Sequence, residues 1–167
     1  MSTKNKHIPC LITIFGATGD LSHRKLFPSL FHLFQQNNLD EHIAIIGIGR
    51  RDLTNDEFRQ QVASSIQHHV GNTDLLDEFM THVYYHRHDV NDEASYQSLL
   101  TFSNELDKQY QLQGNRLFYL AMAPQFFGII SDFLKTSGLT NTHGFKRLVI
   151  EKPFGSDLKS AESLNKQ

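Results

Sequence analysis

The chain has 167 residues, which is enough for one domain with a sizeable hydrophobic core. Its 16 Lys and Arg residues are balanced by 18 Asp and Glu residues, and the net charge of −2 excludes a generally basic nucleic-acid binder. The single cysteine, Cys10, excludes an internal disulfide and a zinc site built from cysteines, and it suits a reducing compartment.

The amino-terminal residues 1–9 are polar and lack the apolar core of a secretory signal. No apolar run in the sequence is long enough to span a membrane. We therefore expect a soluble, cytoplasmic protein that has neither a membrane nor a nucleic acid as a partner.

The first predicted strand, residues 11–15, is a continuous apolar run rich in β-branched side chains. It ends at Gly16, Gly19 follows three residues later, and a basic segment with helical spacing begins almost at once. Strand, glycine turn and helix form the arrangement in which dinucleotide-binding proteins hold a pyrophosphate against helix N-terminal amides. Ser22 replaces the third glycine of the usual fingerprint, so an ordinary strand-to-helix turn remains an alternative. A P-loop is disfavoured because no Gly-Lys-Ser/Thr sequence follows.

Apolar periodicity predicts that helices alternate with four further strands. Pro28 falls within the first helix, which Asn37 and Asn38 close, and it predicts a kink or an irregular first turn. Thr54 is expected to cap the second helix, with Glu57 completing a capping box. In chain order, the later elements are a strand over 43–48, helices over 54–70 and 74–80, a strand over 83–86, a helix over 92–109, a strand over 116–123, a helix over 126–135 and a strand over 147–150.

This alternation predicts an α/β fold, a Rossmann-like doubly wound parallel sheet with helices on both faces. Ligands of such sheets bind at the carboxyl ends of the strands. The distinctive residues of the sequence follow the predicted strand ends, which favours a binding site over a set of ordinary turns. They are Gly16 to Asp20, Arg50 and Arg51, Asp89, Pro124, and Glu151 to Pro153.

The residues after the second strand bear on the choice of coenzyme. An NAD-specific site usually has an acidic residue there, which accepts hydrogen bonds from the ribose hydroxyls. Arg50 and Arg51 stand there instead, and guanidinium groups suit the additional 2′-phosphate of NADP. Asp52 comes next and could still meet a ribose, so use of NAD stays open. A solvent-exposed arginine pair is the alternative.

Other polar residues near strand ends have possible roles at the same edge of the sheet. Asp89 and Val90 could flank an adenine, although Asp89 could instead be an acid at a helix N-terminus. Lys25 lies in the first helical segment, where spacing alone favours a solvent-facing cation. Lys152 follows a buried strand and precedes a proline, which places its ammonium group at the cleft, where it could neutralise phosphate or bond a substrate hydroxyl.

Histidines are frequent but do not predict a metal site. His82, His86 and His88 cluster in the sequence, and the last two are expected to share a strand face. A metal site would need converging carboxylates or further histidines, so we expect none. His68 and His69 are expected at an exposed helix end.

Three motifs, taken together and in this order, resemble those of glucose-6-phosphate dehydrogenases. They are Gly16-Ala17-Thr18-Gly19-Asp20-Leu21 followed by Lys25, then Asn115-Arg116-Leu117-Phe118-Tyr119, then Glu151-Lys152-Pro153-Phe154-Gly155, of which the last is the most specific. The resemblance runs from about residue 10 to the end of the chain. It implies an enzyme of the pentose phosphate pathway that oxidises glucose 6-phosphate at C1 to the 6-phosphogluconolactone and passes a hydride to NADP.

The resemblance also implies roles for individual residues. The turn from Gly16 to Leu21 would hold the pyrophosphate, and Arg50, helped by Arg51, would hold the 2′-phosphate. Lys25 would lie in the cleft near coenzyme and substrate, and Lys152 would touch both, with Pro153 shaping the approach. The adenine would lie at Asp89 and Val90, and Pro124 is assigned to the coenzyme site with them.

One departure from the family concerns catalysis. The catalytic base of the family is a histidine in a downstream His-Tyr-Leu-Gly-Lys motif, which these 167 residues lack. We therefore expect residues 1–155 to form an NADP-binding domain and residues 156–167 to begin a helix leading to a β+α domain for substrate binding and dimerisation. The 167 residues alone are expected to be inactive, and the full-length enzyme is expected to be a homo-oligomer.

Two alternatives remain open. An atypical short-chain reductase also begins with a Gly-Ala-Thr-Gly turn, but such proteins need a Tyr-x-x-x-Lys pair and usually a further glycine, neither of which is present. A non-catalytic NADP-binding module would share the coenzyme site and differ only in having no turnover.

Overall fold

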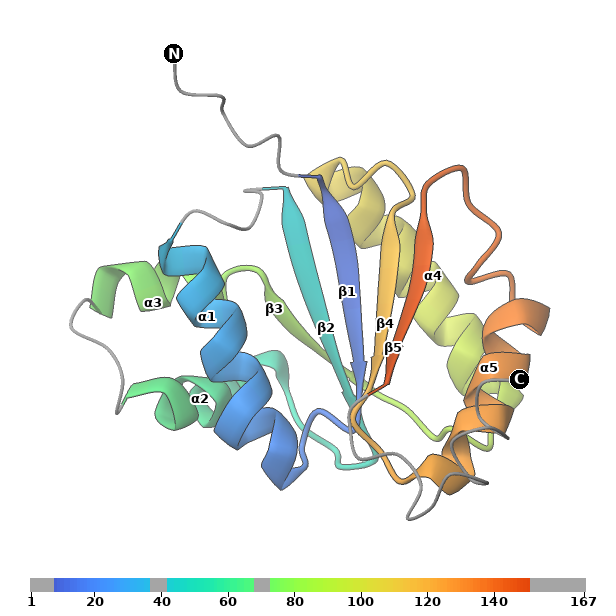
Figure 1. Ribbon diagram of the computed structural model, residues 1–167, viewed down its shortest axis with the longest axis horizontal. Coiled ribbons are helices and arrows are strands. Elements are labelled where there is room, and N and C mark those ends of the chain that lie inside the picture. The colour runs from blue at the N-terminus through green and yellow to red at the C-terminus, as the bar shows by residue number, and fades with distance from the viewer. Residues whose placement is uncertain (1–7, 37–41, 68–72, 151–167) are drawn as a thin grey trace.

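The computed structural model describes residues 8–36, 42–67 and 73–150, and their backbone forms a parallel sheet between helices (Figure 1). The strands are β1 (Cys10–Phe15), β2 (Ile43–Gly49), β3 (Val83–Arg87), β4 (Arg116–Leu120) and β5 (Lys146–Ile150). The α-helices are α1 (Phe27–Gln35), α2 (Asn55–Ile66), α3 (Thr73–Met80), α4 (Glu93–Tyr110) and α5 (Phe127–Thr136). The strands lie in the order β3-β2-β1-β4-β5, and every pair is parallel.

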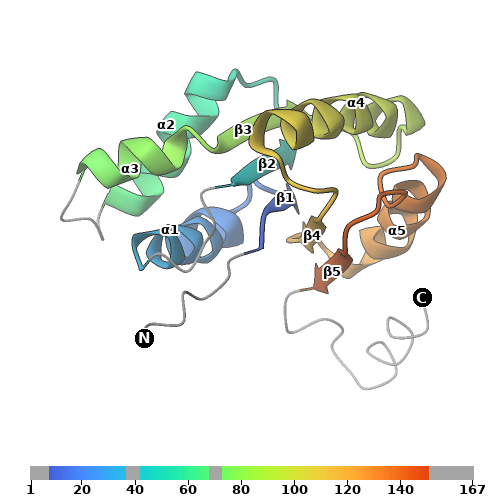
Figure 2. The same ribbon diagram turned by 90° about the horizontal axis from the view of Figure 1, so that it is seen from above.

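Helices cover both faces of the sheet, with α1, α2 and α3 on one side and α4 and α5 on the other (Figure 2). Side chains of β1 alternate between the two layers, as they must along a strand. Ile12 and Ile14 pack in the cluster with α1 to α3, whereas Leu11 and Phe15 pack in the cluster with α4 and α5. Burial on both faces explains why the central strands are apolar at successive positions, and it confirms the doubly wound fold.

Most element boundaries agree with the sequence prediction. Thr54 caps α2, since its hydroxyl accepts a hydrogen bond from the Glu57 amide at 3.1 Å. The irregular first turn predicted from Pro28 is confirmed, because residues 22–26 are π-helical and Pro28 lies in the first turn of α1. None of the described helices has the length and hydropathy needed to cross a bilayer.

One predicted strand is too long. The fourth strand was expected to reach Ala123, but β4 ends at Leu120 because the chain turns there towards a 3₁₀ turn at Pro124–Phe126. The second helix was expected over residues 54–70; α2 covers Asn55–Ile66, and residues 68–70 fall outside the described part of the chain. The predictions for Asn37, Asn38, His68, His69 and all residues after Ile150 fall outside the described residues.

Arg116, in the second of the three sequence motifs, is a buried structural cation. Its side chain is 2% exposed, and its guanidinium donates hydrogen bonds to the Leu139 carbonyl at 2.9 Å and to Asn104 Oδ1 at 2.8 Å. The Asp107 carboxylate lies 4.0 Å away. These contacts join the start of β4 to α4 and to the segment after α5, at the edge of the sheet opposite the strand carboxyl ends.

We expect Arg116→Met to lower the free energy of unfolding by about 1–3 kcal/mol, because the buried Leu139 carbonyl would lose its donor. Urea denaturation followed by circular dichroism measures the change. Lys108→Met, at an exposed position of α4, is the matched control and should have little effect. Equal stability of the two variants would contradict a structural role for the buried guanidinium.

Candidate functional site

The glycine turn begins at the carboxyl end of β1 and is fixed to the neighbouring strand. Gly16 has a φ of +84°, a conformation that favours glycine. The amides of Gly16 and Ala17 both donate to the Ile48 carbonyl, at 3.1 and 3.0 Å. The Gly19 amide then donates to the Gly16 carbonyl at 3.1 Å, which closes the turn. Neighbouring strands therefore determine the course of the backbone in the turn.

Gly16 also meets the segment after β4. A Cβ atom at this position would lie 2.3 Å from the Ala121 carbonyl oxygen and 2.9 Å from Cγ of Met122. The Ala121 amide in turn donates to the Phe15 carbonyl at 2.9 Å. Successive connections leave β1 and β4 towards opposite faces of the sheet, so this contact lies at the topological switch point, where doubly wound folds bind ligands.

Ser22 occupies the position of the missing third glycine without disturbing the turn. Its side chain is fully buried, and its hydroxyl donates to the Gly16 carbonyl at 3.0 Å. This bond ties the first helical turn to the strand end, where the usual glycine would only permit close packing. The sequence prediction treated Ser22 as a weakness of the motif, and the structure shows a stabilising contact instead.

The helix that follows the turn presents its N-terminus at the same edge. Helical residues begin at Asp20, so the amides of Asp20 and Leu21 lie in a first turn that offers them no carbonyl within the helix. Such amides carry a partial positive charge and suit an anion. The exposed Asp20 carboxylate is paired with Arg24 at 2.6 Å, which offsets the negative charge beside this N-terminus.

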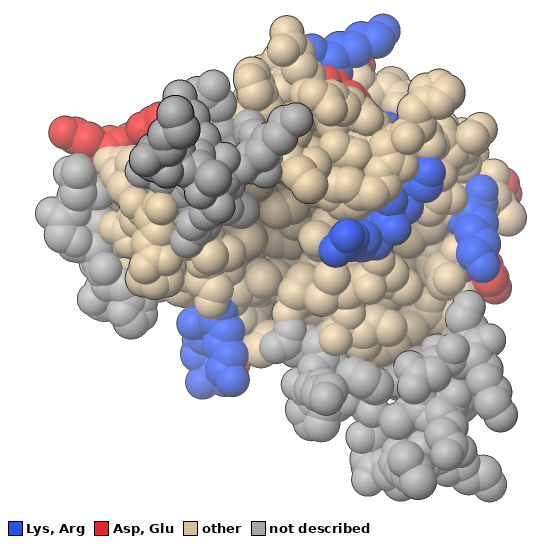
Figure 3. Space-filling model, turned by 45° about the horizontal axis from the view of Figure 1, so that its top comes forward, with Lys and Arg blue, Asp and Glu red and all other residues tan. Residues whose placement is uncertain are grey.

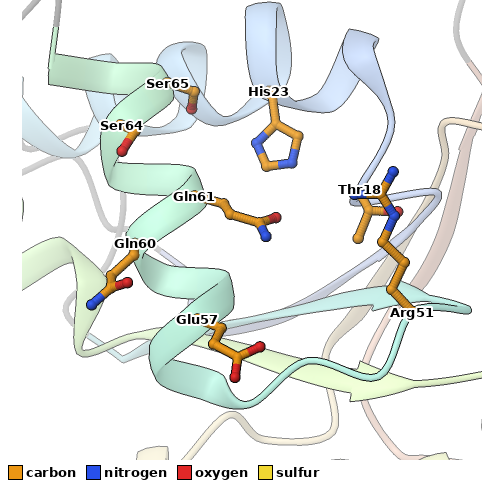
Figure 4. Close-up of a pocket in the computed structure, with 8 residues that line it drawn as sticks. All are labelled: Thr18, His23, Arg51, Glu57, Gln60, Gln61, Ser64 and Ser65. Carbon is orange, nitrogen blue, oxygen red and sulfur yellow. The ribbon is translucent and has the colours of Figure 1, made fainter.

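A polar pocket of 620 Å³ opens beside the turn (Figure 4). Thr18 comes from the glycine turn, His23 from the π-helical segment and Arg51 from the loop after β2, and Figure 4 shows all three side chains on one side of the pocket. The opposite side is formed by α2. Its lining residues there are Glu57, Gln60, Gln61, Ser64 and Ser65.

Tyr85 of β3 and the glycine at the end of β2 hold this pocket in shape. The Tyr85 hydroxyl donates to the Arg51 carbonyl at 2.6 Å, and the Tyr85 amide donates to Asn55 Oδ1 at 2.8 Å. A Cβ at Gly49 would lie 3.0 Å from both Thr18 Cγ2 and the Tyr85 hydroxyl, so a larger residue would press on these groups. Sequence analysis missed Tyr85, because nothing local links it to the loop of Arg51.

Arg50 lines a different pocket from Arg51. This second pocket, of 370 Å³, also contains Asp89. Its other lining residues are Arg87, His88, Asp92 and Ser95. The two arginines therefore leave the end of β2 on different sides, and the structure brings Arg51 together with Thr18 and Arg50 together with Asp89.

Asp89 and Val90 both take part in local structure. One Asp89 carboxylate oxygen accepts a hydrogen bond from the Asn91 amide at 2.9 Å, in the turn that leads into α4. Val90 is buried, and its carbonyl accepts from the Tyr96 hydroxyl at 2.9 Å. These contacts support the alternative of a local structural role for Asp89. An adenine beside these two residues stays a prediction.

Among the histidines near the site, His88 has the pKa that is shifted furthest from its ordinary value. Its side chain is almost fully buried against Tyr96, with ring centroids 4.5 Å apart, and neither ring nitrogen has a hydrogen-bond partner among the described residues. Burial, and then the neighbouring His86, lower the pKa of His88 to about 4, so its imidazole is neutral at physiological pH. His82 has a different partner from His86 and His88, since its Nδ1 contacts the Ile43 carbonyl at 2.7 Å. In the described part of the chain, no three His, Cys, Asp or Glu side chains form a metal-binding group.

The remaining predicted residues are dispersed. Lys25 is exposed on the first helical segment and lines a separate pocket with Pro28 and His32. Pro124 is exposed at the start of the 3₁₀ turn, two residues beyond Met122. Lys152 lies outside the described residues, so its role stays a prediction.

The glycine turn, the parallel strand order and the polar edge agree with a known family. The family model described as "Glucose-6-phosphate dehydrogenase, NAD binding domain" matches residues 13–167. The chain belongs to the glucose-6-phosphate dehydrogenase family. It is a nicotinamide-coenzyme-binding domain of that family, as the resemblance in the sequence implied.

Individual relatives give the same result. The glucose-6-phosphate 1-dehydrogenase of Bacillus subtilis (strain 168) is 49% identical over 163 residues, which cover 98% of this chain and 33% of that protein. The protein of the same name from Leuconostoc mesenteroides is 43% identical over 157 residues, or 94% of this chain and 32% of that protein. A solved structure of glucose-6-phosphate dehydrogenase in complex with its substrate glucose-6-phosphate has a TM-score of 0.85 and 34% identity, and the match covers 96% of this chain and 34% of that one. The chain thus spans about a third of the length of these relatives.

The two glycines of the turn should respond differently to valine. Gly16→Val should destabilise the fold by about 1–3 kcal/mol or more, because a β-branched residue at positive φ is strained and its Cβ would overlap the Ala121 carbonyl. Gly19→Val has only a tight contact to the Gly16 carbonyl, at 3.2 Å, and should keep the fold while abolishing coenzyme binding. Circular dichroism and coenzyme titration separate the two effects. Normal coenzyme binding by the Gly19 variant would show that the phosphates do not lie on this turn.

Proposed function

We propose that this chain is the coenzyme-binding domain of an NADP-dependent glucose-6-phosphate dehydrogenase. The observation that carries the proposal is the pair of arginines at the end of β2, one strand away from the glycine turn of β1. The turn and the helix N-terminus would receive the pyrophosphate, as in other dinucleotide-binding folds. NADP supplies a nicotinamide ring that accepts a hydride when it is bound.

Arg50 and Arg51 support NADP in preference to NAD. They follow β2 in succession and line pockets on different sides of its end, so a 2′-phosphate in either pocket would meet a guanidinium group. Both side chains are exposed and can rearrange around a ligand. The Thr18 hydroxyl in the Arg51 pocket adds a neutral donor. Asp52 remains a candidate for the ribose, so binding of NAD is weaker under this proposal but present.

The activity of the whole enzyme is proposed from the relatives. A relative has been solved with glucose 6-phosphate as its substrate, and this chain matches about a third of that protein. We propose the same substrate here, with Lys152 contacting both sugar phosphate and nicotinamide. Oxidation at C1 needs a base that takes the hydroxyl proton as the hydride leaves. The downstream histidine of the family is proposed to supply it, in a homo-oligomer of the longer protein.

Replacement of each arginine tests the coenzyme assignment. Arg50→Ala and Arg51→Ala should each weaken NADP binding by about 1.5–3 kcal/mol, the size of a charged hydrogen bond, and should change NAD binding much less. Lys108→Ala is the matched control, since it removes an exposed cation from the far end of α4. Calorimetric titration with both coenzymes measures the losses. Equal losses for NADP and NAD would reject the assignment of the 2′-phosphate.

Turnover should require more than these 167 residues. The purified chain should bind NADP but show no NADPH absorbance after glucose 6-phosphate is added, whereas a protein extended to the length of its relatives should be active. In that longer protein, Lys152→Ala should lower turnover sharply and weaken nucleotide binding only modestly. Near-normal turnover of the variant would show that Lys152 is a surface cation.

A further inference from the structure

The pocket beside the glycine turn contains a titratable side chain to which no role has yet been assigned. His23 projects into this pocket on the same side as Thr18 and Arg51 (Figure 4). Its ring lies against two aromatic side chains, with centroids 6.0 Å from Phe27 and 6.4 Å from Phe58. These contacts hold the imidazole at the wall of the pocket, where a bound anion could meet it.

We propose that His23 is a further contact for the 2′-phosphate of NADP, and that the preference for NADP over NAD strengthens as the imidazole takes up a proton. The inference rests on the proposed NADP dependence and adds a residue and a pH response to it. An imidazolium beside Arg51 would give the phosphate a second cationic donor, and the Thr18 hydroxyl would give it a neutral one. A neutral imidazole would supply one ordinary hydrogen bond.

The charges around His23 explain why its protonation depends on a ligand. Burial lowers its pKa below the ordinary 6.5, Arg51 lowers it further by repulsion, and Asp20 partly opposes this. Asp20 is itself paired with Arg24, at 2.6 Å. Glu57 of α2 is the acidic residue lining the pocket from the other side. His23 is therefore neutral at pH 7 when the pocket holds no anion.

A phosphate bound between His23 and Arg51 would favour the protonated form of His23. A nearby dianion favours the charged imidazole, so binding raises the pKa of His23 and takes up a proton. The contribution of His23 to NADP affinity is then small at alkaline pH, and it grows as the pH falls through the pKa of the complex. If that pKa lies about one unit above the value of the unliganded protein, the contribution grows by about tenfold.

The α2 residues that line the pocket offer a phosphate no cation. Four of the five α2 residues that line it are uncharged, namely Gln60, Gln61, Ser64 and Ser65. Figure 3 shows the face towards the amino ends of the strands, where Lys and Arg side chains are scattered among neutral and acidic ones. Among the residues that line the pocket, the cationic contacts for a phosphate would be Arg51 and a protonated His23.

The test compares 2′,5′-ADP with 5′-AMP, which differ only in the 2′-phosphate, from pH 5.5 to 8.5. The ratio of wild-type to His23→Gln affinity for 2′,5′-ADP should rise severalfold from pH 8.5 to pH 5.5, towards the limit of about tenfold that a pKa difference of one unit sets, and the ratio for AMP should stay constant. Using the ratio removes the titration of the phosphate itself, whose second pKa is near 6. His23→Lys should bind 2′,5′-ADP tightly with little pH dependence. His143→Gln, at an exposed loop position before β5, is the matched control and should behave as the wild type.

Proton NMR gives an independent measurement. The imidazole resonances of His23 should titrate at higher pH with 2′,5′-ADP bound than with AMP bound. A pH-independent ratio, or equal titration with both ligands, would overturn the role of His23. The NADP preference and its loss in Arg51→Ala would survive that result, because they do not depend on His23. A wild type that binds 2′,5′-ADP and AMP equally well would reject both proposals.

Discussion

The carbonyl oxygen of Ile48 accepts hydrogen bonds from two successive amides, Gly16 and Ala17, and the geometry of the site depends on this interaction. It brings the end of β1 against the end of β2, so that the glycine turn and the arginine loop become neighbours. Gly16 has positive φ at the point where these two amides meet one carbonyl. Close contact with the Ala121 carbonyl also restricts this position to glycine.

The helical layers keep this arrangement rigid. Buried side chains on both faces of β1 and β2 prevent the strands from shifting by one residue, since a shift would exchange the two faces. Ser22 and Tyr85 then extend the order from the sheet to the loops, through single hydrogen bonds to the Gly16 and Arg51 carbonyls. In the proposed site, anion recognition would rely on backbone positions that the core determines, while Arg50 and Arg51 remain exposed.

Buried polar groups divide into structural and site residues according to the edge of the sheet where they lie. Arg116 is at the amino edge, where it donates hydrogen bonds to Asn104 of α4 and to the Leu139 carbonyl, and burial lowers the pKa of its guanidinium. His88 is at the carboxyl edge, and burial keeps it neutral. His23 lies between these extremes, because it is only partly buried and lines an open pocket. A ligand can change the protonation of a side chain in such a position.

The sequence by itself determined the alternation of strands and helices, the parallel sheet and the position of the glycine turn. These features arise from local patterns, such as continuous apolar runs, helical spacing and the Thr54 cap. Only the tertiary structure decided that Ser22 supports the turn, that Tyr85 holds the Arg51 loop, and that Arg50 and Arg51 line different pockets. Each of these depends on contacts between distant segments or on the direction of a side chain, such as the 34 positions between Tyr85 and Arg51. Local patterns carry no information about which segments meet across a sheet, because packing of the whole core selects those partners.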